Sequence, residues 1–449
     1  TIKLNDKYSP AYTNLANIFK RKGNLNVAKK YYIKSLEIDS KSEITHCNLG
    51  NIFRDLGDFK DAESSYLSAI SINSRYGDAY FNLSNIYRIL GKIDKAEAYI
   101  IKAIKYNSFS PKYYYLLTVI NSNSTNNIWK KQLFSNRILC KTDAHQKVDI
   151  YFARSNVYHQ QKKYNESAKC LQIANEINLR LKPSNMDELI KKSNQLMVES
   201  NIQPIKDKNK DSVMNKIFIV GMPRSGSTLL ESILSMNVNA KDLGEANILE
   251  KAYLKYKKLC SSDKSLSLDE LYSHQINIFR DKYNIIINKW LYNYQYTGII
   301  LSQINDARII HCFRNPLDNI ISIYRTNFAS GNSYSSSIND IAQVYLNQDK
   351  IMTEYKKKYR PLIYDLNYDL LVSKPQEEIK SLINWLEWEW DSSYLTPQKN
   401  ARSVSTASSV QVRSPINSKS IGGWKNYKDM LKPAIKILSK TNKFRNISP

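Results

Sequence analysis

The sequence predicts two regions of different fold class: an N-terminal array of stacked helical hairpins and a C-terminal α/β domain. Small, aromatic and glycine positions recur at a fixed step through the first third of the chain, which is typical of helical repeats. Further along, the short apolar runs 216–220 and 307–313 are each followed by a helical pattern, as in α/β units. No apolar run approaches the roughly 18 residues of a membrane-spanning helix.

The repeat has a period of 34 residues, which is the step from Gly23 to Gly57 and from Gly57 to Gly91. Glycine at these positions fits a tight turn between two helices, which often needs a positive φ. A fourth, diverged copy covers 156–177, after an inserted stretch at 111–147 that holds an Asn/Ser turn. The small residues that keep the step are Ala28, Ala62 and Ala96. We therefore predict three regular helical hairpins and one irregular one.

This pattern resembles the tetratricopeptide repeat over about 9–181, with serines at the usual proline position. Stacked repeats of this kind form a superhelix with a concave face. Two interpretations of that face stay open: it binds a protein or peptide partner, or it serves as a scaffold or homodimerisation arm. We assign 1–198 to the repeat domain, 199–215 to a polar linker and 216–449 to the second domain.

The charge and cysteine content narrow the classes of partner. The formal charge is +25 and the pI is near 9.5, which favours anionic partners, although a lysine-rich composition explains the excess equally well. No basic stripe with interleaved aromatic residues is present, so nucleic acid is not a predicted partner. The five cysteines are scattered, which argues against a disulfide framework and a zinc site and predicts a reducing, cytoplasmic location.

A phosphate-binding loop is predicted at 221–228, between the strand 216–220 and a helix at 229–236. Strand, glycine-containing loop and helix together direct backbone N–H groups at an anion. The loop departs from the nucleoside-triphosphate pattern because Ser227 stands where that pattern has its lysine. The missing countercharge disfavours a kinase or an ATPase.

The stretch 218–234 resembles the 5′-phosphosulfate loop of sulfotransferases, which take a sulfuryl group from 3′-phosphoadenosine-5′-phosphosulfate. A second stretch, 309–324, resembles the 3′-phosphate site of that family, in which Arg314 and Ser322 would hold the phosphate. A guanidinium can bind a phosphate with two parallel hydrogen bonds. By position, the residues that the resemblance assigns to the 5′ loop are Arg224, Ser225, Gly226, Ser227 and Thr228.

Two further stretches agree with this family. The segment 405–424 resembles its C-terminal loop over the nucleotide, in which Ser408 and Arg413 would contact the donor. Tyr368 begins a stretch whose tyrosine lies near the adenine in the family, and a buried structural tyrosine is an equal alternative. Relatives carry a basic residue before the final Trp, but Gly423 stands there and Lys425 follows instead.

Sulfuryl transfer needs a general base and a fixed cation. The resemblance to the protein-tyrosine sulfotransferase and related bacterial branches implies that Glu245 is the base and that Lys289 stabilises the leaving oxygen, although the proline that relatives have after this lysine is missing. His311 is interpreted as a packed strand residue, and His274 has no supporting motif. Neither a metal cluster nor a metal-dependent step is predicted.

The resemblance as a whole covers 216–428 and implies a mainly parallel sheet with helices on both faces and the ligand at the strand ends. It predicts a bacterial sulfotransferase that sulfates the hydroxyl of a peptide tyrosine, a glycan or a small molecule by in-line single displacement. The alternative is a repeat scaffold whose transferase site binds nucleotide but has lost activity.

Overall fold

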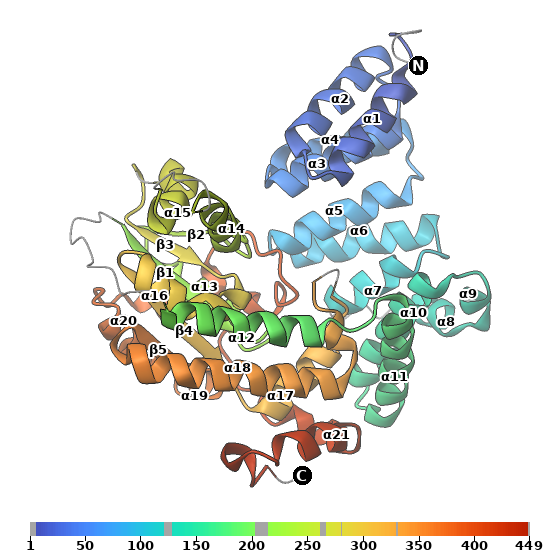
Figure 1. The fold of residues 1–449 in the computed structure, drawn as a ribbon. Coiled ribbons are helices and arrows are strands. Elements are labelled where there is room, and N and C mark those ends of the chain that lie inside the picture. The colour runs from blue at the N-terminus through green and yellow to red at the C-terminus, as the bar shows by residue number, and fades with distance from the viewer. Residues whose placement is uncertain are drawn as a thin grey trace. The chain divides into compact units, whose positions relative to one another are not determined.

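The computed structural model describes residues 6–120, 128–202, 214–260, 266–279, 281–328 and 331–447 (Figure 1). These residues divide into two compact units. The first contains the chain up to Lys162 together with Ala401–Ser405, and the second contains Lys163–Asn400 and the chain from Thr406 onward. The short segment Ala401–Ser405 is bonded to the helices of the first unit through its backbone. The N–H of Val404 donates to the Ile89 carbonyl at 2.9 Å.

The first unit is built from helices that pack in antiparallel pairs. They are α1 (Ser9–Arg21), α2 (Leu25–Ile38), α3 (Glu43–Leu56), α4 (Phe59–Ile72), α5 (Gly77–Ile89), α6 (Ile93–Tyr106), α7 (Pro111–Ile120), α8 (Ile128–Phe134), α9 (Asn136–Cys140) and α10 (Ala144–Gln160). The three regular hairpins confirm the repeat that the sequence predicts. The predicted turn at 121–127 lies outside the described residues, and α7 packs against α10.

Close helix contact within a hairpin depends on a small residue opposite a large one. A Cβ atom at Gly50 of α3 would lie 2.6 Å from the Tyr66 ring of α4, so only glycine fits there. Tyr66 then donates a hydrogen bond of 2.8 Å to Asn51, and the preceding hairpin repeats the bond between Tyr32 and Asn17 at 2.6 Å. The turn glycine Gly57 has a φ of +88°, as the sequence predicts for a left-handed helix end.

The second unit alternates helices and strands. Its helices are α11 (Tyr164–Leu181), α12 (Met186–Ile202), α13 (Ser227–Leu234), α14 (Ile248–Cys260), α15 (Leu268–Ile276), α16 (Thr297–Gln303), α17 (Pro316–Tyr324), α18 (Ile338–Tyr359), α19 (Tyr368–Ser373), α20 (Pro375–Trp385) and α21 (Lys428–Leu438). Its strands are β1 (Asn215–Gly221), β2 (Ala240–Asp242), β3 (Ile285–Asn288), β4 (Ala307–Phe313) and β5 (Ile363–Asn367). Short 3₁₀ helices used below are η2 (Leu291–Tyr296), η3 (Ser333–Ser336), η7 (Gln411–Arg413) and η8 (Gly423–Tyr427).

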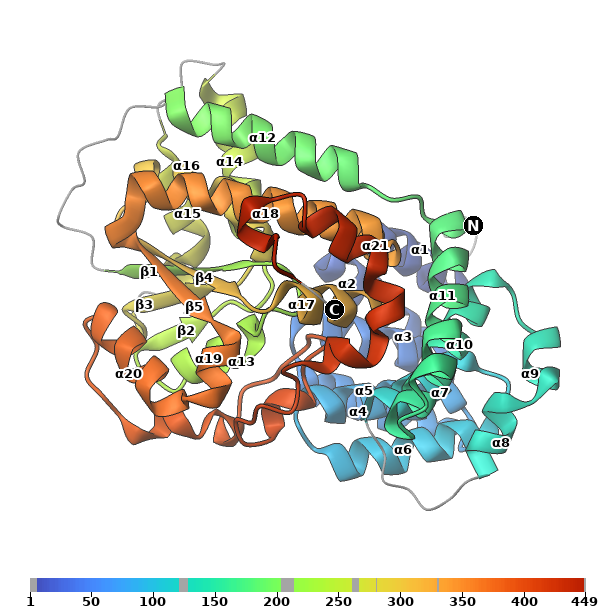
Figure 2. The same cartoon turned by 90° about the horizontal axis from the view of Figure 1, so that it is seen from below.

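The strands form one parallel sheet in the order β2-β3-β1-β4-β5, which confirms the predicted α/β class. Alternate strand residues face two separate cores. Phe218 and Val220 pack with α12, α14, α15, α16 and α18 on one face, whereas Ile217 and Ile219 pack with α13 and α20 on the other. Figure 2 shows the two helical layers on either side of the sheet. No helix in the described part of the chain is both long and apolar enough to cross a membrane.

The expected linker 199–215 differs from the structure at both ends. Glu199 lies in the last turns of α12, where it accepts hydrogen bonds from Tyr253 at 2.5 Å and Lys257 at 3.0 Å, both on α14. Asn215 begins β1, and 203–213 lie outside the described residues. The partners of Glu199 are remote in sequence. Composition alone therefore makes the end of this packed helix resemble a linker. The helix α11, which the sequence assigned to the repeat domain, makes most of its contacts within the second unit, and the predicted domain bounds stay a prediction.

Candidate active site

The carboxyl ends of the five parallel strands meet at one edge of the sheet, and each is followed by a residue or loop that the sequence singled out. The chain runs from β1 toward β2 on one side and from β3 past β1 to β4 on the other, so the strand order reverses at β1, where ligands bind in open α/β sheets. The residues that follow the strands are the loop 222–226 after β1, Glu245 after β2, Lys289 after β3, Arg314 after β4 and Tyr368 after β5.

The loop after β1 lies so close to its neighbours that it needs glycine twice. A Cβ atom at Gly221 would lie 2.2 Å from the Cys312 carbonyl oxygen, and one at Gly226 would lie 2.2 Å from the Tyr368 ring. Both glycines also have a positive φ, +145° and +96°. Among the described residues, no side chain caps the N-terminus of α13, and the buried hydroxyl of Ser225 has no hydrogen-bond partner. The loop therefore presents donors that suit an anion.

Arg224 connects this loop to two other predicted segments. Its Nε donates to Ser322 of α17 at 3.1 Å, its Nη1 to Ser408 at 2.5 Å and its Nη2 to Gln411 of η7 at 3.0 Å. All three partners are neutral, so these bonds orient the guanidinium without neutralising its charge. Arg224 holds this position with a φ of +66°, which is unusual for a residue with a side chain.

Arg314 is 7% exposed and lies against the face of Tyr368, with its guanidinium carbon 4.7 Å from the ring centre. Its Nη2 donates to the Ser420 carbonyl at 2.8 Å, and Tyr368 and Ser420 share a hydrogen bond of 2.8 Å. Its Nε has no hydrogen-bond partner within the described chain, although it lies 4.0 Å from an Asp369 oxygen. Arg314 thus keeps a buried donor that a phosphate oxygen would satisfy.

The C-terminal loop is attached to the same edge by a residue that the sequence analysis missed. The Asp318 carboxylate accepts from the backbone N–H groups of Gly422 at 2.7 Å and Trp424 at 2.9 Å. The available signal in the sequence was an acidic residue, Asp318, one helical turn after Arg314, the arginine predicted to bind phosphate. Thr228 of α13 also contacts Thr406 at 3.2 Å. The structure therefore brings the C-terminal loop to the predicted phosphate residues.

Two basic residues of this segment have other surroundings. The Nη1 of Arg413 donates to the Asn400 carbonyl at 2.6 Å. Lys425 is exposed in the middle of η8, after Trp424. A contact of either side chain with the donor stays a prediction.

Lys289 and Glu245 contact each other, with Lys289 Nζ 3.0 Å from Glu245 Oε1. The contact follows from strand order, because β2 pairs with β3 and the Leu243 N–H donates to the Ile287 carbonyl at 2.9 Å. The Lys289 side chain is fully buried, whereas the Glu245 side chain is 46% exposed. A second carboxylate, Glu231 of α13, lies 3.3 Å from the same ammonium and is 1% exposed. The sequence analysis did not single out Glu231, because one acid within an amphipathic helix carries no signal.

His311 lies inside β4, as the sequence analysis expected of a packed residue. It is 2% exposed, its Nε2 contacts Gln348 at 2.6 Å and its Nδ1 lies 3.5 Å from Asp365. Burial lowers the pKa of His311 to about 4, so the ring is neutral at physiological pH. Burial also raises the pKa of the neighbouring Cys312 thiol. Both residues are therefore interior groups of the strand.

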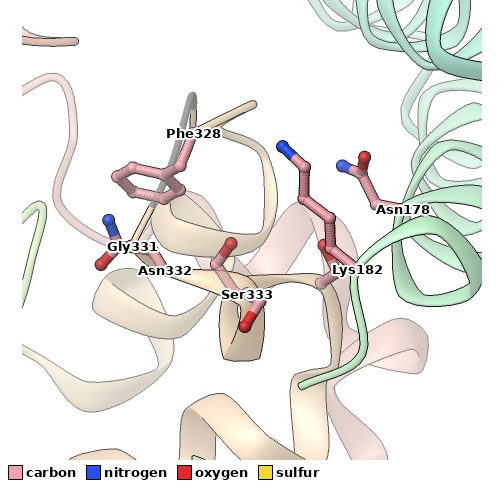
Figure 3. Close-up of a pocket in the computed structure, with 8 residues that line it drawn as sticks. Asn178, Lys182, Phe328, Gly331, Asn332 and Ser333 are labelled. Carbon is pink, nitrogen blue, oxygen red and sulfur yellow. The ribbon is translucent and has the colours of Figure 1, made fainter. Parts of the chain in front are cut away.

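A cavity of about 40 Å³ lies between the end of α11 and the residues before and within η3 (Figure 3). Figure 3 shows Phe328, Lys182 and Asn178 around its opening, above Ser333. Asn332, which lines the cavity, accepts a hydrogen bond from Tyr292 of η2. Burial raises the pKa of Tyr292, and the neighbouring Tyr334 adds to the effect. The hydrogen bond from Tyr292 therefore joins η2 to the lining of this cavity.

Two family models match segments of this chain. Residues 216–392 match the model of the sulfotransferase family, and 9–42, 45–76, 77–109 and 148–179 match that of the tetratricopeptide repeat. The last of these segments confirms the predicted fourth copy. A protein of Aquifex aeolicus (strain VF5), called uncharacterized, is 32% identical over 243 residues, which are 49% of this chain and 32% of the relative. The chain thus spans about a third of that protein's length.

Among solved structures, two that are similar to parts of this chain have low TM-scores. The sulfotransferase domain of the Synechococcus PCC 7002 olefin synthase is 17% identical and covers 54% of this chain and 99% of its own, with a TM-score of 0.38. YrrB, a tetratricopeptide-repeat protein with an unusual peptide-binding site, is 20% identical and covers 41% of this chain and 92% of its own, with a TM-score of 0.30. From the matched family models, the chain joins tetratricopeptide repeats to a domain of the sulfotransferase family.

Proposed function

We propose that the second unit transfers a sulfuryl group from 3′-phosphoadenosine-5′-phosphosulfate to an acceptor hydroxyl. The observation that supports this most directly is the contact of 3.0 Å between Glu245 and the buried Lys289, at the same sheet edge as the anion-binding loop. A base and a fixed cation in one crevice are the two groups that the transfer needs.

The donor fits the residues around the loop. The N-terminus of α13 and the hydroxyls of Ser225, Ser227 and Thr228 would hold the 5′-phosphosulfate, since they offer hydrogen-bond donors without carrying charge. Arg314 would hold the 3′-phosphate with Ser322, and the lack of a hydrogen-bond partner for its Nε within the described chain supports this assignment. Arg224, bonded to both Ser322 and Ser408, would orient the segments on either side of the nucleotide.

The chemical step then runs as a single displacement. Glu245 takes the proton of the acceptor hydroxyl while the hydroxyl oxygen of the acceptor forms a bond to sulfur. The bond between sulfur and the 5′-phosphate oxygen breaks, and its electron pair stays on that oxygen. The Lys289 ammonium stabilises the charge that develops there. The exposure of Glu245 supports its role, because a base must reach an acceptor that arrives from solvent.

The acceptor enters this proposal as a class, a hydroxyl on a peptide tyrosine, a glycan or a small molecule. Asn332 in the cavity wall is hydrogen-bonded to Tyr292, which follows Lys289 closely in the chain, so we assign the cavity to the acceptor side of the reaction. We further propose that the repeats of the first unit bind a protein or peptide partner, as their resemblance to tetratricopeptide repeats suggests.

Two measurements test the function. Calorimetry should show tight binding of 3′-phosphoadenosine 5′-phosphate and much weaker binding of ATP, because the loop lacks the lysine that ATP needs. Transfer of labelled sulfate should then occur to at least one of peptide, glycan and small-alcohol acceptors. A folded protein that does not bind the nucleotide contradicts the proposal. Nucleotide binding without transfer to any acceptor would instead favour the scaffold with a lost activity.

A further inference from the structure

Lys289 lies between two carboxylates that differ in their access to solvent. Its Nζ is 3.0 Å from Glu245 Oε1 and 3.3 Å from Glu231 Oε2. The ammonium is fully buried, Glu231 is 1% exposed and Glu245 is 46% exposed. Glu231 belongs to α13, one helical turn after Ser227, so it shares a helix face with a residue of the anion-binding loop.

These exposures separate the roles of the two acids. A general base must contact the acceptor hydroxyl, and only Glu245 is accessible enough to do so. Glu231 is almost fully buried, and its carboxylate lies 3.3 Å from the Lys289 ammonium. Glu231 is therefore not a second base, and its effect on the reaction must pass through the lysine.

A buried ammonium needs a countercharge, because an unpaired charge in the protein interior is costly. Glu245 can supply that charge only until it takes the acceptor proton, which makes it neutral. Glu231 takes no part in that proton transfer, because the acceptor does not reach it. The lysine then keeps one anionic partner inside the protein while its other face meets the leaving phosphate oxygen.

We propose that Glu231 is a positioning residue that holds the Lys289 ammonium in place for the leaving oxygen while Glu245 changes its charge. This inference rests on the proposed sulfuryl transfer. The proton passes from the acceptor to Glu245 alone, the bond between sulfur and the phosphate oxygen breaks, and Glu231 neither gains nor loses a proton. Without Glu231, the lysine would lose its fixed partner at the moment when Glu245 is neutralised.

A stability cycle tests the pairing without any measurement of activity. Lys289→Met leaves Glu231 buried without a cation and should lower Tm strongly, because removal of one partner of a buried pair is strongly destabilising. Glu231→Gln in the Lys289→Met background should recover much of that loss, because both charges are then gone. If the double variant melts no higher than Lys289→Met, Glu231 is not the fixed partner of the lysine and the inference fails.

An activity cycle tests the positioning role. Glu231→Gln should lower kcat for sulfate transfer by about 10²-fold to 10³-fold, the effect of losing one group that supports transition-state charge. The KM of the acceptor should stay within a few-fold, and Glu231→Asp should restore part of kcat. In the Lys289→Met background, Glu231→Gln should cause no further loss, because residues that act as a unit are not additive. Independent, multiplying losses would overturn the inference.

Asp269→Asn is the matched control for both cycles. Asp269 lies 2.7 Å from the ammonium of Lys216, whose side chain is 3% exposed. Lys216 lies near the amino end of β1, at the opposite end of this strand from the anion-binding loop. Its loss should lower Tm but leave kcat within a few-fold. If Asp269→Asn lowers kcat as much as Glu231→Gln, a general loss of packing explains both effects and the inference fails.

The outcomes separate this inference from the function on which it rests. A wild-type chain that binds no 3′-phosphoadenosine 5′-phosphate overturns the proposed function and the inference with it. A wild-type chain that transfers sulfate while the losses at 231 and 289 multiply overturns only the role of Glu231. If Glu231→Gln alone does not fold, the comparison of the double variant with Lys289→Met decides the question in both Tm and kcat.

Discussion

Two buried lysines lie at opposite edges of the same sheet, and their surroundings differ. Lys216, at the amino end of β1, pairs with Asp269, whose two oxygens also accept from the backbone N–H of Asn305 at 3.1 Å and from its side chain at 3.3 Å. Lys289, at the carboxyl end of β3, pairs with Glu231 and with the half-exposed Glu245. The first pair is closed off by protein partners, and the second is open on one side to solvent.

The same difference extends along the carboxyl edge. Within the described chain, the hydroxyl of Ser225 and the Nε of Arg314 are buried there without hydrogen-bond partners. Burying such groups unpaired costs about 1–3 kcal/mol each. In the proposed donor complex, the 5′-phosphosulfate would supply the partner of Ser225 and the 3′-phosphate that of Arg314. A buried charge by itself therefore does not identify a functional site. A buried charge beside polar groups that lack hydrogen-bond partners does.

The largest expected effect comes from the open side of the Lys289 pair. Glu245→Gln should lower sulfate transfer by about 10²-fold to 10⁴-fold, because the amide cannot accept the acceptor proton. Binding of 3′-phosphoadenosine 5′-phosphate should stay within a few-fold, because the loop and Arg314 are unchanged. Initial rates with labelled donor and calorimetry of the same preparation measure both quantities. Retained transfer would remove Glu245 from the proposed role and weaken the contrast between the two edges.

His311 is a buried group away from the open side of the Lys289 pair, and its burial predicts how stability depends on pH. Its pKa is lowered from 6.5 to about 4 mainly by burial, with Asp365 opposing the effect and Lys356 adding to it. Because the folded pKa lies below the unfolded one, the unfolded state binds more protons between these values. Stability should therefore fall by up to about 3 kcal/mol as the pH drops from 6.5 to 4.

Urea unfolding as a function of pH measures this loss. The variant His311→Asn should show a smaller decrease in the free energy of unfolding across the same window, because the titrating ring is gone. Asp365 acts in a lower window, since Arg360, Lys356 and His311 lower its pKa from 3.8, so its loss is separable. Equal slopes for variant and wild type would mean that His311 is not held neutral by the fold.

The sequence predicted the parts of the site that depend on local motifs. The loop after β1, Arg314 after β4 and Lys289 after β3 each follow an apolar strand, so their place at one sheet edge was predictable once the strands were taken as parallel. Glu231 and Asp318 were missed, because each is one acid within a helix and its role depends on a partner brought close by tertiary folding. The polar end of α12 was assigned to a linker for the same reason, since Tyr253 and Lys257 satisfy Glu199 from α14.

A smaller effect, on nucleotide binding, is expected from Arg314, the proposed 3′-phosphate residue at the carboxyl ends of the strands. Arg314→Ala should weaken binding of 3′-phosphoadenosine 5′-phosphate by roughly 10-fold to 100-fold, the value of hydrogen bonds to a charged group. Binding of adenosine 5′-phosphate, which lacks the 3′-phosphate, should change less, so the ratio of the two affinities should fall.

Arg308→Ala is the control for this change. Arg308 lies near the amino end of the same strand, where it donates to the Trp385 carbonyl at 2.8 Å and pairs with Glu387. Calorimetry should show no change in nucleotide binding for this variant. An equal loss of affinity in both variants would mean that β4 responds as a whole and that Arg314 does not select the 3′-phosphate.

The smallest expected effect is at Ser408, whose hydroxyl accepts a hydrogen bond from Arg224. Ser408→Ala should weaken binding of 3′-phosphoadenosine 5′-phosphate about 2-fold to 10-fold, because one net hydrogen bond is lost while Ser322 and Gln411 still orient the guanidinium. Calorimetry at several ionic strengths measures the change, and Ser439→Ala, at the end of α21, is a matched surface control. A loss as large as that of Arg314→Ala would mean that Ser408 contacts the nucleotide itself, and the open edge would then include the C-terminal loop as a direct ligand rather than as a support for Arg224.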